Sequence, residues 1–168
     1  MKKIILLLLS VMLLCSCGVD KTESGEVLPK KTTSGRVGDT LEYGNIKLTL
    51  ESVEKYVDNS EFKLDVAEEG KEFILLRFVA ENTGDEDDHI NMFYEEAYCD
   101  DVAIDSEALL FSADGDALWG DVAAGKMRKG YVAYELDENW SKLEFAYQHD
   151  MFSDDSKLTF EVLKEDIK

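Results

Sequence analysis

The chain has 168 residues, with 18 basic and 37 acidic side chains and a formal net charge of −19. Such an acidic excess disfavours direct binding to nucleic acid or to an anionic membrane surface, because phosphates are bound through Lys and Arg. Hydrophobic residues make up 45% of the sequence, which is enough for one sizeable core and therefore indicates a single folded domain.

The N-terminus is typical of a bacterial signal peptide. Lys2 and Lys3 provide a positive start, and residues 4–15 are apolar apart from Ser10. This run is too short to cross a bilayer, which takes roughly 20 residues. The alternatives are an ordinary secretory signal with incidental cysteines and a buried N-terminal helix. We predict a signal peptide over residues 1–16.

The next residues resemble the lipobox of bacterial lipoproteins. Leu14 stands three positions before Cys17, and the small Ser16 directly precedes it. In such proteins the cysteine thiol receives a diacylglycerol, and cleavage makes that cysteine the first residue. Cys15 fits less well, because bulky Leu14 would lie at its cleavage site. The resemblance implies lipid attachment at Cys17, and acyl chains that contribute about 0.8 kcal/mol per buried methylene would hold the protein on the outer face of the cell membrane.

The segment after Cys17 is expected to be a flexible linker. Residues 17–35 are rich in Ser, Thr, Lys and Gly, include the only proline, Pro29, and show no apolar periodicity. With Cys17 lipidated, Cys99 is the one thiol left, so no intrachain disulfide is expected. Cys99 ends the apolar-rich residues 93–99 and has no basic neighbour to lower its pKa, so we interpret it as a packing residue.

From residue 36 onward the patterns are those of β-strands. Ile46, Leu48 and Leu50 alternate with polar residues, which is typical of a strand with one buried face. Residues 72–82 are apolar on both faces around residues 74–76, which predicts a central strand. Further strands are expected at residues 93–99, 130–136, 142–147 and 157–163.

Turn clusters between these segments predict seven to nine strands in an all-β sandwich over residues 36–168. Residues 105–111 are the one stretch expected to form a short helix, with Asp105 or Ser106 as its N-cap.

Few residues suggest metal binding. The two histidines, His89 and His149, exclude a site built from several His ligands. His89 lies beside acidic residues 85–88, and a solvent-exposed acidic hairpin loop is favoured over a cation site, because adjacent carboxylates rarely converge on one ion. The nearest sequence to a calcium loop contains Asp114, Asp116 and Asp121, but it lacks the usual oxygen spacing and the final Glu.

Few residues suggest catalysis either. His149 and Asp150 could form half of a triad, yet no nucleophile elbow accompanies them. Carboxylate pairs for glycoside hydrolysis are neither marked out nor excluded. We therefore expect a protein that is not an enzyme and needs no cofactor.

Three aromatic residues are candidates for a ligand-facing platform that stacks on sugars or peptides: Trp119, Trp140 and Tyr147. Trp140 stands just before an expected strand, where a position in the core or at a sheet edge is more common.

Several segments together resemble a known family. They are residues 38–40, 45–46 and 50–54; residues 72–76 leading into the Asn-Thr-Gly turn at 80–84; residues 124–126 with 130–135; and residues 143–147. They are similar to an immunoglobulin-like domain of unknown function found in lipoproteins of Gram-positive bacteria. This family is akin in fold to the mycobacterial immunoprotective secreted antigen and is sometimes mislabelled as telomeric repeat-binding factor.

The resemblance implies an immunoglobulin-like sandwich and supplies no catalytic residues. The family usually has proline before the Gly-Lys pair, where Ala124 stands in this chain. We expect a non-enzymatic interaction or ligand-binding module at the cell surface, with an unidentified protein or small ligand as partner. The alternatives are an accessory subunit of envelope machinery, and a divalent-cation-binding or hydrolytic domain that uses the acidic loops.

Overall fold

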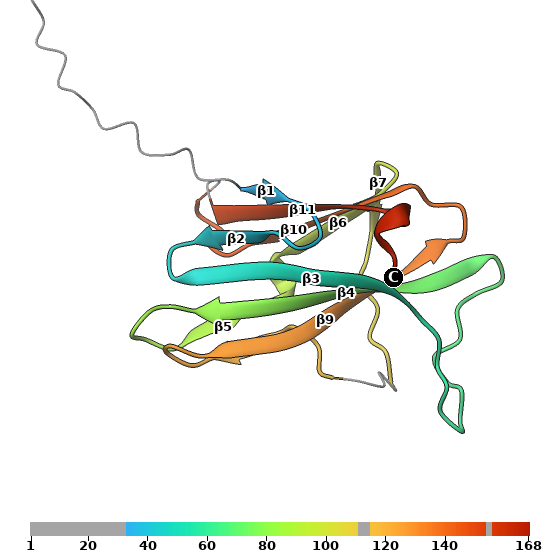
Figure 1. Cartoon of the computed structure of the whole chain (residues 1–168), viewed down its shortest axis with the longest axis horizontal. Helices are drawn as coiled ribbons and strands as arrows, with labels where there is room; N and C mark the ends of the chain where they lie inside the picture. The colour runs from blue at the N-terminus through green and yellow to red at the C-terminus, as the bar shows by residue number, and fades with distance from the viewer. Residues whose placement is uncertain (1–32, 111–114, 154–155) are drawn as a thin grey trace, which may run out of the picture. The chain divides into compact units, whose positions relative to one another are not determined.

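Two β-sheets form the folded part of the computed structural model, which describes residues 33–110, 115–153 and 156–168 (Figure 1). The first sheet has five strands in the order β1-β11-β10-β6-β7, and the second has four in the order β2-β3-β4-β9. The strands of the first sheet are β1 (Ser34–Gly35), β11 (Lys157–Leu163), β10 (Lys142–Gln148), β6 (Glu95–Cys99) and β7 (Val102–Ile104). Those of the second are β2 (Thr40–Tyr43), β3 (Ile46–Tyr56), β4 (Lys71–Asn82) and β9 (Met127–Asp137).

Short elements complete the architecture. β5 (Asp88–Ile90) and β8 (Gly120–Val122) pair as a small third sheet, and 3-10 turns lie at η1 (Met92–Tyr94) and η3 (Lys164–Asp166). Seven of the described strands have at least four residues, and the other four have two or three. The prediction of an all-β sandwich is confirmed.

Alternating side chains explain why the long strands form. In β11 every second residue is buried, so the strand presents one apolar face to the core. β4 departs from this pattern at Ile74, Leu75 and Leu76, which are all buried. Leu75 packs on the outer face of the second sheet with Tyr56 and Tyr131, so β4 is covered on both sides, as predicted.

The core lies between the two sheets. Phe78 of β4 packs against Phe145 of β10 and Phe160 of β11, with ring centroids 4.8 and 5.5 Å apart. Burial of one such side chain contributes about 2–3 kcal/mol. These three rings come from both sheets and hold them together.

The strand registers define two ends of the sandwich. The carbonyl of Thr33 accepts a hydrogen bond from Thr159 N at 2.8 Å, near the turn that joins β10 to β11. We call this end of the sandwich, where the described chain begins, the entry end. At the opposite end Lys142 pairs with Leu163, and the β6–β7 turn lies beside them; we call this the distal end. The described residues from 33 onward belong to one compact unit.

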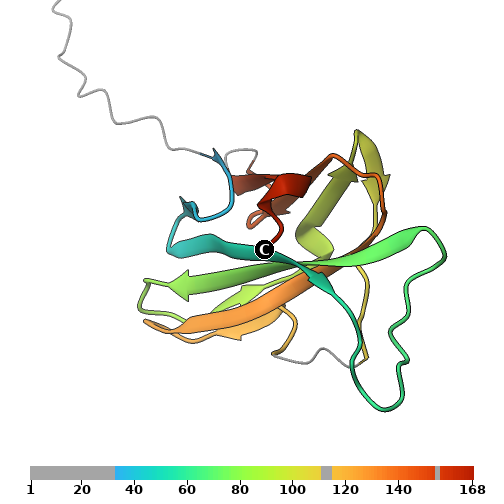
Figure 2. The same ribbon diagram turned by 45° about the vertical axis from the view of Figure 1, so that its right-hand side comes forward.

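Figure 2 shows the β3–β4 connection, residues 57–70, projecting from the sheets. Val57, Phe62 and Val66 are 58%, 68% and 70% exposed there. Asp58 stabilises the loop, because its carboxylate accepts hydrogen bonds from Ser60 N at 2.7 Å and Asp65 N at 3.2 Å.

Three local predictions were wrong. Residues 105–110 are not helical: Glu107 N donates to Ala133 O at 2.8 Å instead, because pairing with a sheet edge outweighs local helix propensity. Phe111 lies outside the described residues. Residues 93 and 94 belong to η1 rather than to the strand that follows, and His89 lies in β5, not in a hairpin loop.

The predicted signal peptide (residues 1–16), the lipid site Cys17 and residues 17–32 of the predicted linker lie outside the described residues. The linker was expected to extend to residue 35, but Ser34 and Gly35 form β1, because they pair with Thr159 and Phe160 of β11. Within the described ranges, no helix has the length and apolar character needed to cross a membrane.

Candidate functional site

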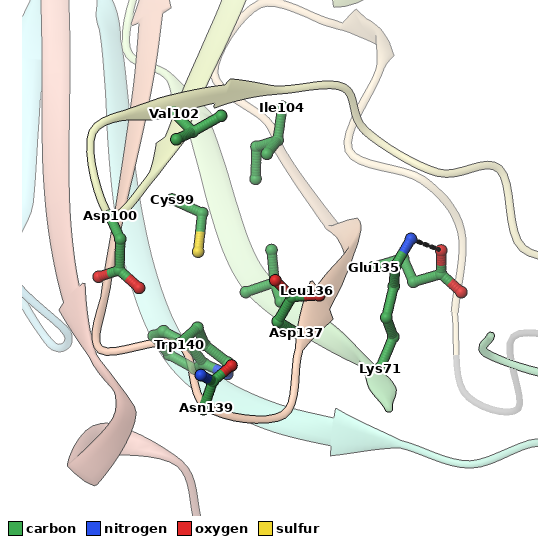
Figure 3. A pocket seen from close by; sticks show the side chains of 10 residues that line it. All are labelled: Lys71, Cys99, Asp100, Val102, Ile104, Glu135, Leu136, Asp137, Asn139 and Trp140. Atoms are coloured by element: carbon green, nitrogen blue, oxygen red, sulfur yellow. Dashed lines mark hydrogen bonds and ion pairs between the residues drawn. The ribbon is translucent and has the colours of Figure 1, made fainter. Parts of the chain in front are cut away.

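A groove of about 370 Å³ lies at the distal end, between the hairpin of β6 and β7 and the end of β9 (Figure 3). Its volume falls within the range of about 300–1,000 Å³ that is common for ligand sites. β7 and β9 are the outermost strands of their sheets, so the groove opens between two sheet edges.

The hairpin wall of the groove is apolar and firmly held. Cys99, Val102 and Ile104 line it. The turn between the strands has Asp100 and Asp101 at φ 48° and 68°, a left-handed conformation that Asp tolerates in two-residue hairpins. The Asp100 carboxylate accepts hydrogen bonds from the backbone N–H of Ser141 at 3.0 Å and of Lys142 at 2.9 Å. These bonds fix the wall to the start of β10.

Trp140 and Leu136 form the floor, and each is only 2% exposed. The Trp140 indole Nε1 donates to Glu72 Oε1 at 3.0 Å. Glu72 also pairs with Lys55 Nζ at 2.8 Å and with Lys164 Nζ at 3.1 Å. This network holds the indole in one orientation.

The charge state of Glu72 follows from the same contacts. Burial by itself raises the pKa of this carboxyl, but the hydrogen bonds from Lys55, Lys164 and Trp140 outweigh burial and lower the pKa below its ordinary value. Glu72 is therefore a buried, ionised anchor for the floor.

The remaining wall carries charge. Lys71 Nζ lies 3.3 Å from Glu135 Oε2 and 2.6 Å from Glu68 Oε2, so its ammonium is neutralised by two carboxylates. Asp137 is exposed, and no cationic side chain pairs with it among the described residues. With Asp100, Glu135 and Asp137 against Lys71, the lining of the groove is acidic.

The β9 edge at the groove is open. Nearer the middle of the strand, Tyr131 exchanges backbone hydrogen bonds with residues 116 and 118, and Ala133 O accepts from Glu107 N. Strand geometry repeats every two residues, and β9 pairs with β4 without a register shift, so the backbone groups of Glu135 face the same outer side. Within the described part of the chain, no residue pairs with Glu135 N–H and C=O on that side.

Cys99 lines the groove as a poorly reactive thiol. It is half-buried and packs against the core. Burial, followed by the nearby carboxylates of Asp100 and Asp137, raises its pKa to about 11.

We expect Cys99 to react with iodoacetamide near neutral pH at least about tenfold more slowly than free cysteine, because little thiolate is present. The measurement uses the full chain with Cys15→Ser and Cys17→Ser, so that Cys99 is the single thiol. The same chain in denaturant is the control and should react at the rate of free cysteine. Equal rates in the folded and unfolded chains would contradict the prediction.

A second depression, of about 430 Å³, lies at the entry end. There His149 Nε2 pairs with Asp88 Oδ2 at 3.2 Å, and His149 Nδ1 lies 3.4 Å from the Tyr147 hydroxyl. The partner of His149 is therefore Asp88 and not Asp150, whose carboxylate accepts from Phe152 N instead. Burial raises the pKa of Tyr147 to about 12, so this hydroxyl is a poor nucleophile beside the imidazole.

The three aromatic candidates do not form a common platform. Trp140 and Tyr147 are 2% and 0% exposed, because core packing takes up most of the surface of their rings. They also lie near opposite ends of β10. Trp119 is half-buried against the core and lines a separate cavity of about 170 Å³.

The acidic candidates for calcium stay apart in the described residues. Across residues 33–110, 115–153 and 156–168, no group of three or more His, Cys, Asp or Glu could hold a metal ion. Asp121 instead pairs with His89 Nδ1 at 2.7 Å on the surface. Asp116 pairs through its backbone with Tyr131, and Asp114 lies outside the described residues.

One half-buried acid, Glu95, has no signal in the sequence. Glu95 accepts a hydrogen bond from the hydroxyl of Tyr134, which is fully buried, and another from Ser106 Oγ at 2.9 Å. Burial raises the pKa of Glu95, and these hydrogen bonds only partly offset that effect. Burial also raises the pKa of Tyr134 well above its ordinary value.

The raised pKa of Glu95 predicts a pH dependence of stability. The folded state binds the Glu95 proton more tightly than the unfolded chain, so the free energy of unfolding falls as pH rises above about 4.5 toward the folded pKa. Glu95→Gln keeps an acceptor for Tyr134 and should reduce this slope without loss of stability at neutral pH. Urea denaturation across this pH range is the measurement.

The control for this prediction is Glu96→Gln, because Glu96 is exposed and its one ion pair within the described residues is the surface pair with Lys157. That variant should keep the slope of the wild type. The prediction fails if Glu95→Gln and Glu96→Gln give the same pH profile.

Solved structures share this fold at low sequence identity. A candidate lipoprotein, ycdA, from Bacillus subtilis matches 76% of this chain with a TM-score of 0.59 and 15% identity, and the chain covers 39% of its length. The yjhA protein of Bacillus subtilis matches 77% of this chain, with a TM-score of 0.54 and 16% identity. The match covers 98% of the yjhA chain. A functionally unknown protein from Listeria monocytogenes matches 73% of this chain, with a TM-score of 0.53 and 14% identity. The match covers 79% of the Listeria chain.

No curated protein matches the sequence. A family model does match, over residues 35–158, and its description is a domain of unknown function, DUF4352. This range contains both sheets except the start of β1 and most of β11. The chain belongs to the DUF4352 family.

Proposed function

We propose that this protein is a lipid-anchored, non-enzymatic binding module of the cell surface and that the groove at the distal end is its ligand site. In this proposal, residues 1–16 are the signal peptide, Cys17 carries the lipid, residues 17–33 are the linker, and the binding domain begins with β1 at Ser34. The protein acts on the extracellular side of the cell membrane.

The position of the groove carries the proposal. The described chain enters the sandwich at Thr33, whose carbonyl bonds Thr159 at the entry end, whereas the groove lies at the distal end. A linker from Cys17 to Thr33 reaches at most about 55 Å when fully extended. A domain tethered in this way can present its groove away from the membrane, toward partners in the envelope or outside the cell.

The groups in the groove favour binding over catalysis. Its floor is a fixed aromatic ring, its thiol has a raised pKa, and its one ammonium is already paired with two carboxylates. Apolar floors with a few polar groups at the rim are typical of ligand sites. The Lys71 amine contacts Glu135, but its hydrogen bonds to Glu68 and Glu135 raise the pKa of Lys71, so it is held as an ammonium ion and is a poor nucleophile.

Anchoring is tested by growing cells that express the full chain on labelled palmitate. We expect label on the wild-type chain and on a Cys15→Ser variant, and none on Cys17→Ser. The Cys15→Ser variant is the matched control, because it removes a neighbouring thiol in the same segment. Label on Cys17→Ser would contradict the proposed lipid site.

Groove binding is tested with fluorinated tryptophan, since the chain has only two tryptophans, Trp119 and Trp140. The full chain, purified in detergent, is mixed in turn with peptide, glycan and lipid fractions of an envelope extract. We expect one fraction to shift the fluorine resonance of Trp140 and not that of Trp119, which lines a different cavity. A Trp140→Phe variant assigns the resonances. If no fraction shifts Trp140, the groove is not the ligand site.

A further inference from the structure

The class of ligand follows from the open strand edge and from the charge of the groove. We propose that the groove receives an extended peptide segment with alternating apolar and basic side chains, which pairs with β9 at Glu135–Asp137 as an added strand. This inference rests on the proposed function, because it uses the same groove as the ligand site.

The backbone of β9 offers a short template for such a strand. Glu135 N–H and C=O face the open side of β9, and Asp137 N–H has the same orientation two residues later. The Asp137 carbonyl is already used, since it accepts from Trp140 N at 3.0 Å. Two or three hydrogen bonds are available to a peptide, which is the typical mode of strand addition to a sheet edge.

The side chains around this edge specify an alternating pattern. Leu136 points to the core side of β9, where Trp140 and the apolar hairpin wall lie. Glu135 and Asp137 point to the opposite face, because successive side chains of a strand alternate. An added strand would therefore place every second side chain against the apolar hairpin wall of the groove, where Val102 is 65% exposed, and the others beside the two carboxylates.

Charge complementarity selects a basic peptide. Asp137 has no cationic partner among the described residues, and Glu68 and Glu135 share a single ammonium, that of Lys71. The whole chain carries a net charge of −19, so an acidic peptide or a second copy of this chain would be repelled. Lysine or arginine at the outward positions of the peptide would reduce this charge excess.

The test uses three fluorescent synthetic heptapeptides with blocked ends, measured by anisotropy with the full chain in detergent. The first alternates Lys and Val, the second alternates Glu and Val, and the third is the first with its central amides N-methylated. We expect the Lys-Val peptide to bind with a Kd on the order of 10 µM, and both others to bind at least about tenfold more weakly. Equal binding of the Lys-Val and Glu-Val peptides, or no effect of N-methylation, would overturn the inference.

Two matched variants test the strand edge itself. Glu135→Pro and Glu135→Ala both remove the carboxylate that pairs with Lys71, but only proline removes the backbone N–H. Both should fold, because proline is tolerated where an edge N–H faces solvent, and thermal unfolding checks this. We expect Glu135→Pro to weaken Lys-Val binding at least about fivefold relative to Glu135→Ala. Equal binding by the two variants would overturn the inference; if Glu135→Pro fails to fold, the N-methylated peptide decides.

The two proposals fail in different ways. If a glycan or lipid fraction shifts the Trp140 resonance while no synthetic peptide binds, the groove is a ligand site and the peptide inference is overturned. If the Lys-Val peptide binds and shifts Trp140, both proposals are supported. If neither fractions nor peptides affect Trp140, both are overturned.

Discussion

Substitution of Gly130 by alanine is expected to destabilise the folded domain by about 3–4 kcal/mol. A Cβ at this position in β9 would lie 2.5 Å from Leu118 Cα and 2.6 Å from Leu118 N, distances that no packed structure accommodates. The segment at 117–118 would have to move away from β9. That movement breaks the backbone hydrogen bonds of Tyr131 with Leu118 at 3.0 Å and Asp116 at 3.1 Å. Urea denaturation measures the change in the free energy of unfolding.

The control for this prediction is Gly125→Ala. Gly125 has φ +65° and no atom within 4 Å of an added Cβ, so its substitution introduces only backbone strain of about 1 kcal/mol. If the two alanine variants were equally stable, close backbone contact at Gly130 would not be the reason for the glycine.

Replacement of Glu72 by leucine is expected to destabilise the fold by about 3 kcal/mol at neutral pH. The substitution leaves the buried Trp140 Nε1–H without its acceptor and removes the carboxylate shared by Lys55 and Lys164. The two ammonium groups contribute less than the indole, because their side chains are 48% and 39% exposed and water can solvate them.

The effect of Glu72→Leu should depend on pH in a defined direction. The folded pKa of Glu72 is lowered, so its stabilisation is fully present above the ordinary value of 4.5 and is lost as pH falls through the folded pKa. The difference between wild type and variant should therefore shrink in acid. Urea denaturation at neutral pH and at about pH 3 is the measurement.

Glu51→Leu is the matched control for Glu72→Leu. Glu51 forms an exposed ion pair with Lys129 at 3.0 Å, and its loss should change stability by less than about 1 kcal/mol. Near-ultraviolet circular dichroism adds a second readout, because the Trp140 indole should lose its fixed orientation only in Glu72→Leu. Equal losses of stability in the two variants would contradict a special role for Glu72.

The long strands could be predicted from the sequence because their side-chain pattern is local. The alternation around Ile46, Leu48 and Leu50 marks β3, and the apolar run at residues 74–76 marks the doubly covered β4. Short strands such as β5, β7 and β8 have three residues each and carry no such pattern. They exist because a partner strand pairs with them. The same kind of pairing, between Glu107 and Ala133, replaced the predicted helix.

The groove could not be predicted from any local pattern. Its residues come from the start of β4, the β6–β7 hairpin, the end of β9 and the turn that follows β9, and only the fold brings them together. Trp140 is visible in the sequence as a candidate, but the local pattern does not show that its ring is buried and that its Nε1–H donates to Glu72. The hydrogen bond between Glu95 and the buried Tyr134 could not be predicted for the same reason, since the two residues are distant in sequence.

The sequence by itself determined the fold class, the family resemblance and the acidic charge, because alternation, turn residues and composition are properties of neighbouring residues. It also supports the lipid anchor at Cys17, which stays a prediction. Only the tertiary structure brings together the groove that we propose as the ligand site. The groove depends on the distance between two sheet edges and on an open stretch of β9 backbone. Both are determined by strand pairing between residues that are far apart in the sequence.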